Sequence, residues 1–175
     1  MIGEDLLVFQ AKSFYNAYIT LEQVSRQSED DLLLYVPIIV NGAFSSELTL
    51  KAILTKNQIE YENEHNLLSL FELLPDSFRS ELIEHLIQKA PEYKEPEKFV
   101  DELILISNAF VDWRYAFEDK PVPALDTRFL SAFANAAIWT MFSYYNASFE
   151  RCDNVEKSDE EIEEMINENR ELCKK

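Results

Sequence analysis

Glycine and proline are scarce in this chain, which has 2 glycines and 6 prolines among 175 residues. These two residue types form most tight turns, so we expect few turns and a small number of long secondary-structure elements. No segment alternates apolar and polar residues between hairpin turns, as the strands of a β-sandwich or barrel would. The sequence therefore predicts an all-α fold, a bundle of about five to seven helices.

Cysteine and histidine are equally rare, with two residues of each kind. They do not form a zinc-ligand set, and the paired Glu-x-x-His motifs of di-iron bundles are absent. Two glycines also exclude a glycine-rich loop that would hold a phosphate. We therefore expect no metal and no cofactor, and we expect Cys152 and Cys173 to be reduced thiols.

Positive charge is the third shortage, because 33 acidic residues face 16 basic ones and the formal net charge is −17. Such a surface repels nucleic acid at long range. Non-specific binding to a duplex is therefore not expected unless basic residues cluster or a partner supplies charge. RNA stays a possible ligand that the net charge disfavours.

Membrane association is not expected either. Glu4 and Asp5 interrupt any apolar N-terminal run, so the sequence predicts no signal peptide. The segment 129–149 has no charged residue and is long enough to span a bilayer. It also carries several serine, threonine and asparagine residues, which favours a buried central helix or an oligomer interface. The expected location is the cytoplasm.

Apolar residues recur at spacings of three and four along most of the chain, which is typical of amphipathic helices. We predict one domain with a core from about residue 5 to 149, followed by an acidic tail or surface helix from 150 to 175. Gly42 lies inside a predicted helix, where it indicates a close approach to another helix. The predicted helices span about residues 5–26, 33–56, 65–75, 78–90, 96–120, 125–149 and 159–172.

Two of these helices carry apolar stripes that matter below. The stripe of the first helix is expected to face the core, and residues 96–120 are expected to form one helix that Pro121 ends. The stripe of the first helix comprises Leu6, Phe9, Phe14, Ala17, Leu21 and Val24, and that of the later helix comprises Phe99, Leu103, Ile106, Phe110, Trp113 and Phe117.

Arg114 is the residue most suggestive of a site. It follows Leu103 by about three helical turns, so a continuous helix would place it on the apolar stripe, with Glu118 one turn further on. Glu47 has a comparable place on the helix at 33–56, with Lys51 one turn later. Two interpretations stay open: a buried Arg–Glu network that fixes helix register, or a polar pocket that holds a phosphate or an RNA backbone.

Three segments together resemble a known family. Residues 42–54 (GAFSSELTLKAIL), 65–71 (HNLLSLF) and 106–118 (ISNAFVDWRYAFE) are similar, in this order, to helices of HEPN-domain proteins. The resemblance implies an up-and-down bundle of about four to five helices that usually dimerises. It also implies one of two roles: metal-independent ribonucleases of toxin–antitoxin, CRISPR and phage-defence systems, or non-catalytic proteins that partner nucleotidyltransferases or bind nucleotides and RNA.

The ribonuclease motif of that family is an arginine followed, after four to six residues, by a histidine. Arg114 occupies the arginine place, but residues 119–121 are Asp, Lys and Pro. The resemblance therefore favours a non-catalytic, dimeric protein, with a nucleotidyltransferase or an antitoxin as possible partner. Its ligand-binding residues would be Arg114, Glu47, Lys51 and Tyr115.

Two alternatives remain. A divergent, metal-independent ribonuclease would use Arg114 with Glu118, Glu47 or His65. A pure interaction module would present its acidic surface to a basic partner. His65 has a simpler expected role as well, as a helix cap or as a hydrogen bond from a loop to the core.

Overall fold

The computed structural model describes residues 2–27, 32–115 and 124–145, and these residues form helices and connecting loops without a strand. The prediction of an all-α helical bundle is confirmed. Glu118, Pro121 and the predicted acidic segment 150–175 lie outside the described residues. The elements are α1 (Ile2–Ser25), α2 (Leu32–Lys56), α3 (Leu67–Leu73), α4 (Asp76–Lys89), the short 3-10 helix η1 (Pro91–Tyr93), α5 (Pro96–Ile106), α6 (Ala109–Arg114) and α7 (Thr127–Tyr145).

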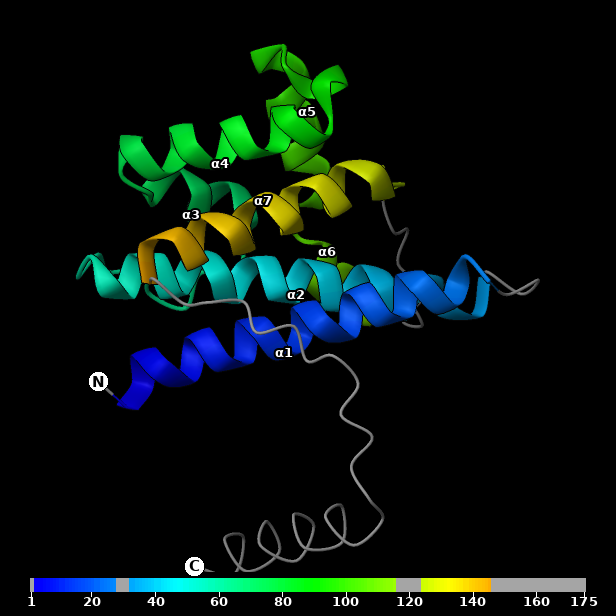
Figure 1. Cartoon of the computed structure of the whole chain (residues 1–175), viewed down its shortest axis with the longest axis horizontal. Coiled ribbons are helices and arrows are strands. Elements are labelled where there is room, and N and C mark those ends of the chain that lie inside the picture. Colours follow the sequence, from blue (N-terminus) through cyan, green and yellow to red (C-terminus); the bar gives the residue numbers. More distant parts are fainter. Residues whose placement is uncertain (1, 28–31, 116–123, 146–175) are drawn as a thin grey trace, which may run out of the picture.

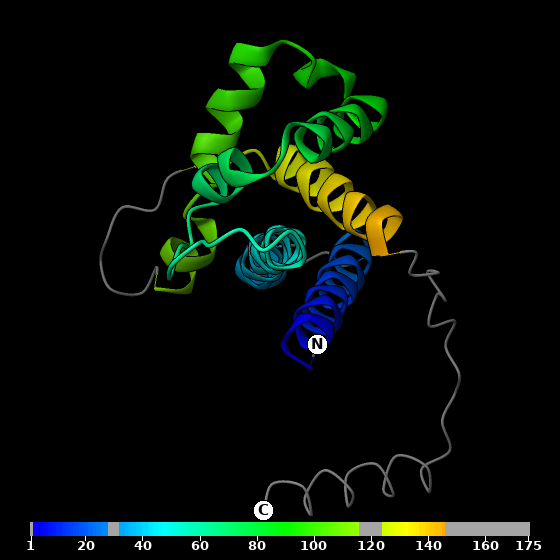
Figure 2. The same cartoon turned by 90° about the vertical axis from the view of Figure 1, so that its left-hand side faces the viewer.

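Helix α2 is the centre of the bundle, with α1, α3, α6 and α7 packed around it (Figure 2). Helices α1 and α2 run side by side over most of their length, and α4 covers the side of α7 that faces away from α2 (Figure 1). Apolar side chains of α2 such as Leu50 and Ile53 are fully buried as a result. By length and composition α2 is the one described helix apolar enough to cross a membrane, but 56% of its apolar window is buried inside the protein, as in the core helix of a soluble protein.

The close approach that Gly42 predicts occurs between α2 and α1. A methyl group at Gly42 would lie 3.1 Å from Cδ2 of Tyr18, whose ring is fully buried. The Ser45 hydroxyl, one turn along α2, donates a hydrogen bond of 3.1 Å to the Ala11 carbonyl. Glycine at this position lets the two helix backbones come near enough for that bond.

The buried face of α1 differs from the predicted one. Ala11, Tyr15 and Tyr18 face the core, whereas Phe9 is 66% and Val24 49% exposed. Tyrosine is apolar enough for a core when its hydroxyl is satisfied, and Tyr15 donates a hydrogen bond of 2.6 Å to Asn135 Oδ1 of α7. Of the predicted stripe, Phe14 and Leu21 do pack against the core, so the prediction was wrong for Leu6, Phe9, Ala17 and Val24, because both faces of α1 carry large apolar side chains.

The predicted helix over 96–120 is broken, because α5 ends at Ile106 and α6 begins at Ala109. Leu67 is the first residue of α3, and the Ser107 carbonyl accepts its N–H at 3.0 Å. The Ser107 hydroxyl also accepts the N–H of Leu68 at 3.1 Å. These bonds hold the start of α3 against the end of α5, and α6 forms a separate helix. Arg114 therefore does not continue the stripe of Leu103.

The uncharged segment that begins at Phe129 is a buried helix in its described part, as predicted. Phe129, Phe133, Ile138 and Met141 of α7 are fully buried. At its end Tyr145 donates a hydrogen bond of 3.0 Å to the Ala52 carbonyl of α2. Helix α7, which carries no charged residue after Arg128, therefore forms the second central layer of the bundle.

Candidate functional site

Glu47 is a carboxylate buried in the interior of α2, with 1% of its surface exposed. Its Oε1 accepts hydrogen bonds from Lys51 Nζ at 2.7 Å and from His65 Nδ1 at 2.8 Å. Its Oε2 is buried without a hydrogen-bond partner. A buried carboxylate needs compensating charge, and two cation-forming side chains meet on one of its oxygens. We call Glu47, Lys51 and His65 the Glu47 cluster.

Lys51 belongs to this cluster because residues four apart lie on the same face of a helix. The lysine is nearly buried, at 9% exposure, and its ammonium lies 5.6 Å from the centre of the Tyr61 ring. The Tyr61 hydroxyl in turn shares a hydrogen bond of 2.9 Å with Thr55 of α2. The ammonium is thus fixed between a carboxylate and an aromatic face.

The loop before α3 positions His65. Glu64 Oε1 accepts the backbone N–H groups of His65 at 2.8 Å and of Asn66 at 2.7 Å. These bonds, that of Asn66 above all, lower the pKa of the Glu64 carboxyl. Asn66 caps α3 by accepting the Ser69 N–H at 3.0 Å, and its amide donates to Asn108 Oδ1 at the start of α6 at 3.2 Å. Asn66, and not His65, is therefore the cap of α3. His65 has the second of its two expected roles, because it makes the hydrogen bond from the loop to the core.

The His65 imidazole is available for chemistry. Its side chain is 54% exposed, and its Nδ1 is held by the carboxylate of Glu47. A carboxylate partner favours the tautomer with a proton on Nδ1, which leaves Nε2 as a proton acceptor, or as a donor once the ring is charged. The cluster can therefore exchange a proton or bind an oxyanion at Nε2.

Arg114 and Tyr115 lie at the end of α6 and not in the Glu47 cluster. The Arg114 side chain is exposed, and its guanidinium carbon lies 4.6 Å from the centre of the Phe110 ring and 4.5 Å from that of Tyr115. Among the described residues Arg114 has no ion pair, so the expected network with Glu47 does not form. The network does not form because the helix is broken at Ser107, so Arg114 does not continue the helical register of α5.

A row of stacked rings nevertheless links Arg114 to α2. Phe110 stacks on Phe44 at 4.2 Å between ring centres, and Phe44 contacts Phe14 of α1 edge-on at 4.5 Å. Phe44 lies about one turn before Glu47 on α2. Arg114 and the Glu47 cluster therefore lie at separate places on the part of the surface built from α2, α6 and the loop before α3.

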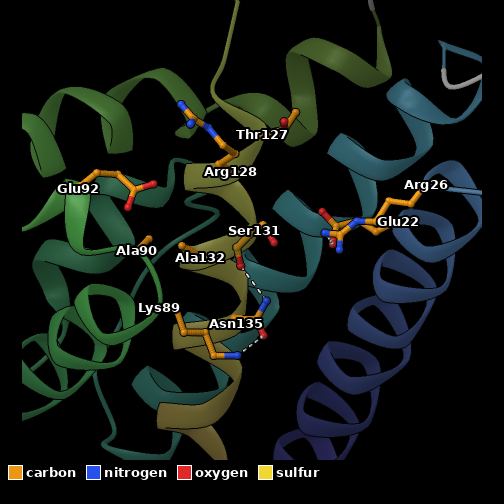
Figure 3. A pocket seen from close by; sticks show the side chains of 10 residues that line it. All are labelled: Glu22, Arg26, Lys89, Ala90, Glu92, Thr127, Arg128, Ser131, Ala132 and Asn135. Carbon is orange, nitrogen blue, oxygen red and sulfur yellow. Dashed lines mark hydrogen bonds and ion pairs between the residues drawn. The ribbon is translucent and has the colours of Figure 1, made fainter.

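A second polar depression lies between α1, α4 and α7 and was not predicted from the sequence (Figure 3). Its volume is about 390 Å³, at the lower end of small-molecule sites. Both positively and negatively charged side chains line this depression. The lining residues are Glu22, Arg26, Lys89, Ala90, Glu92, Thr127, Arg128, Ser131, Ala132 and Asn135.

Asn135 organises the floor of this depression. Its Oδ1 accepts from Tyr15 and, at 3.4 Å, from Lys89 Nζ, while its amide donates to the Ser131 carbonyl at 2.9 Å (Figure 3). Ser131 and Asn135 are polar residues four apart in the uncharged segment of the sequence, and this spacing is the signal that could have revealed the depression. Most rim charges already have partners: Arg26 pairs with Glu22 at 3.5 Å.

The described residues contain no group of three or more histidine, cysteine, aspartate or glutamate side chains that could hold a metal ion. Comparison with known proteins finds no family model, curated protein or solved structure that matches the chain at a significant level.

Proposed function

We propose that this chain is a HEPN-like helical protein that works as a homodimer and binds a nucleotide or RNA through its phosphates, without cleaving it. A toxin–antitoxin or phage-defence system, with a nucleotidyltransferase or antitoxin partner, is the setting that the family resemblance favours. The observation that carries the proposed binding is the His65 imidazole, held by buried Glu47 and half-exposed to solvent.

The charge of the Glu47 cluster supports an anionic ligand. Glu47 and Lys51 neutralise each other, so a protonated His65 adds one positive charge at the surface. A hydrogen bond from an imidazolium to a phosphate oxygen is charge-assisted and stronger than a neutral one.

Arg114 supplies a second anchor at a distance. Its guanidinium has no carboxylate partner among the described residues, and it lies over the rings of Phe110 and Tyr115 at the exposed end of α6. His65 is joined to the start of α6 through Asn66 and Asn108, while Arg114 ends this helix, about 9 Å further along. The length of α6 thus separates the residue that His65 is linked to from Arg114, and this suits contacts to separate phosphates of an extended backbone better than contacts to a single reacting phosphate.

The test measures binding of a short fluorescent single-stranded RNA by anisotropy, in EDTA. We expect His65→Ala and Arg114→Ala each to weaken binding roughly five- to tenfold, because each removes one charge-assisted contact. Lys94→Ala removes an exposed cation next to η1 and should leave the affinity unchanged. Absence of binding by the wild type, or equal losses in all three variants, would overturn the proposal.

The second candidate is a metal-independent ribonuclease, which the Glu47–His65 pair specifically favours. His65 Nε2 would take the proton of a ribose 2′-hydroxyl as its oxygen attacks the adjacent phosphorus. The bond from phosphorus to the 5′-oxygen would break, that oxygen would take up the proton, and a 2′,3′-cyclic phosphate would remain. The same RNA incubated with wild type and His65→Ala decides: cleavage by the wild type that the variant lacks favours this candidate, and intact RNA favours binding alone.

A further inference from the structure

The side of α1 that faces away from the bundle carries an apolar surface free of charge. In Figures 1 and 2 no helix of the described residues covers this side of α1. Leu6 is 52%, Phe9 66% and Val24 49% exposed, and they share one face with exposed Ser13, Ala17 and Thr20. We call these six residues the α1 outer face.

Both charged side chains of α1 between Leu6 and Ser25 point elsewhere. The Lys12 ammonium lies 5.7 Å from the centre of the Phe142 ring of α7, and Glu22 pairs with Arg26 at the depression of Figure 3. A helix face with exposed apolar residues and no charge is unusual on a chain with 28% charged residues. Charged residues are depleted in the same way at the centres of protein–protein interfaces.

The polar groups on the α1 outer face are already satisfied. The Ser13 hydroxyl donates to the Phe9 carbonyl at 2.9 Å, and the Thr20 hydroxyl donates to the Asn16 carbonyl at 2.8 Å. Covering this face would therefore leave neither hydroxyl donor without an acceptor. The usual cost of burying a polar side chain does not arise for them.

We infer that the α1 outer face binds the same face of a second copy of this chain, with the two helices antiparallel about a twofold axis near position 15. This inference rests on the homodimer of the proposed function and names its interface. Two chains of net charge −17 repel each other, and a neutral face is where they can approach with the least repulsion. A basic partner would instead be drawn to the acidic faces of the molecule.

The order of side chains along the face is complementary to itself in this arrangement. Antiparallel pairing about position 15 sets Leu6 opposite Val24 of the partner subunit and Ser13 opposite Ala17 of the partner subunit. Phe9 then lies beside Thr20 of the partner subunit. The small residues at the centre let the helices approach closely, while larger apolar residues fill both ends. The Glu47 cluster and α6 lie on another side of α2 and stay accessible (Figure 2).

Sedimentation equilibrium of the full chain tests the inference, with far-UV circular dichroism as the check on folding. We expect a dimer for the wild type and a dissociation constant raised about thirtyfold or more by Phe9→Glu or Ala17→Glu, since each dimer carries the change twice. Ile104→Glu, at an α5 residue that is 51% exposed, should leave the dimer intact. A monomeric wild type, or a dimer that tolerates both α1 substitutions, would overturn the inference.

Cysteine cross-linking tests the orientation, in a background with Cys152 and Cys173 replaced by serine. Ser13→Cys mixed with Ala17→Cys should form a disulfide between the two variants. Either variant alone should not, because residues two positions from the axis would lie about 10 Å from their own copies, too far for a disulfide. Cross-linking of Ser13→Cys to itself would indicate parallel helices and contradict the arrangement.

RNA binding measured on the same proteins separates the two hypotheses. A dimer disrupted by Phe9→Glu in a chain that binds no RNA would support the interface and reject the proposed ligand. RNA binding by a monomeric wild type would do the reverse.

Discussion

Tyr15 and Tyr18 are neighbours on the buried face of α1, but their hydroxyl groups differ. Tyr15 donates to Asn135, whereas the Tyr18 hydroxyl is buried without a hydrogen-bond partner. Burial raises the pKa of Tyr15 to about 12 and that of Tyr18 further still. The Tyr18 hydroxyl lies near the side chains of Ser131 and Glu22 without a hydrogen bond of good geometry, so it recovers little of what it lost with water.

The two tyrosines should therefore respond in opposite ways to the loss of their hydroxyls. We expect Tyr15→Phe to lower the free energy of unfolding by about 1 kcal/mol, and Tyr18→Phe to raise it by up to about 1 kcal/mol. Urea denaturation at neutral pH measures both. Equal destabilisation by the two substitutions would show that the Tyr18 hydroxyl is hydrogen-bonded in solution.

Asp126, just before α7, is a carboxylate that accepts hydrogen bonds from two side chains. Arg128 Nη2 donates to its Oδ2 at 2.9 Å and Tyr93 donates to the same oxygen at 2.8 Å. These bonds, that of Arg128 first, lower the pKa of Asp126 from 3.8 to about 2. The same pairing raises the pKa of Arg128.

A carboxyl whose pKa is lower in the folded state stabilises the fold above its unfolded pKa and loses this effect as the pH falls toward its folded pKa. Asp126 should thus contribute about 1–2 kcal/mol at neutral pH, discounted because Arg128 is largely exposed, and lose it between about pH 4 and pH 2. We expect Asp126→Asn to be less stable than the wild type at pH 6, with the gap reduced to about a third at pH 2.5, which lies just above the folded pKa. Urea titrations at both pH values measure the gap, and a constant gap would contradict the pKa assignment.

At the scale of the elements, the junction of α5, α6 and α3 depends on Ser107. Its hydroxyl donates to the Leu103 carbonyl at 2.6 Å while accepting the Leu68 N–H, and the residue is 2% exposed. One side chain therefore closes the last turn of α5 and caps the first turn of α3. The periodicity of residues 96–120 could not reveal this break, because its cause is a bond to a helix about forty residues away in the chain.

Ser107→Ala should lower the free energy of unfolding by about 2 kcal/mol, because the Leu68 N–H loses its acceptor in a partly buried position. Ser80→Ala, at an exposed position of α4, serves as control and should change it by less than about 0.5 kcal/mol. Thermal or urea denaturation compares the two. A Ser107→Ala variant as stable as the control would mean that the carbonyl of residue 107 alone holds the junction.

Other elements were predictable because their signals are local. The lengths of α2 and α4 follow from periodicity and from prolines, and the approach at Gly42 follows from a glycine in a helix interior. The buried face of α1 was not predictable, because both faces of the helix carry apolar side chains. Contacts with distant residues decide between them, such as the bond from Tyr15 to Asn135, 120 residues away.

At the scale of the whole molecule, the candidate site combines one local relation and one distant one. The pairing of Glu47 with Lys51 is a consequence of helical spacing and could be expected. His65 reaches the same carboxylate only because the loop after α2 reverses the chain, with positive φ angles at Gln58 and Asn63. Arg114 was expected in the same cluster and lies apart from it, because that expectation assumed an unbroken helix.

The distribution of charge is also a property of the whole molecule. The chain carries an excess of acidic residues, yet the α1 outer face, the described part of α7 after Arg128 and most of α2 are uncharged. Neutral surface and neutral core therefore lie on either side of the same long helix.

The single carboxylate oxygen shared by Lys51 and His65 has a consequence for how this sequence can drift during evolution. Replacing Glu47 alone would leave the nearly buried Lys51 ammonium without a counter-charge, and replacing Lys51 alone would leave Glu47 charged in the core with only His65 to compensate. The low-cost mutational route changes the two positions on α2 together, while the half-exposed histidine can vary on its own if only stability is under selection. A lineage that keeps all three residues would therefore bear the mark of selection on the imidazole itself.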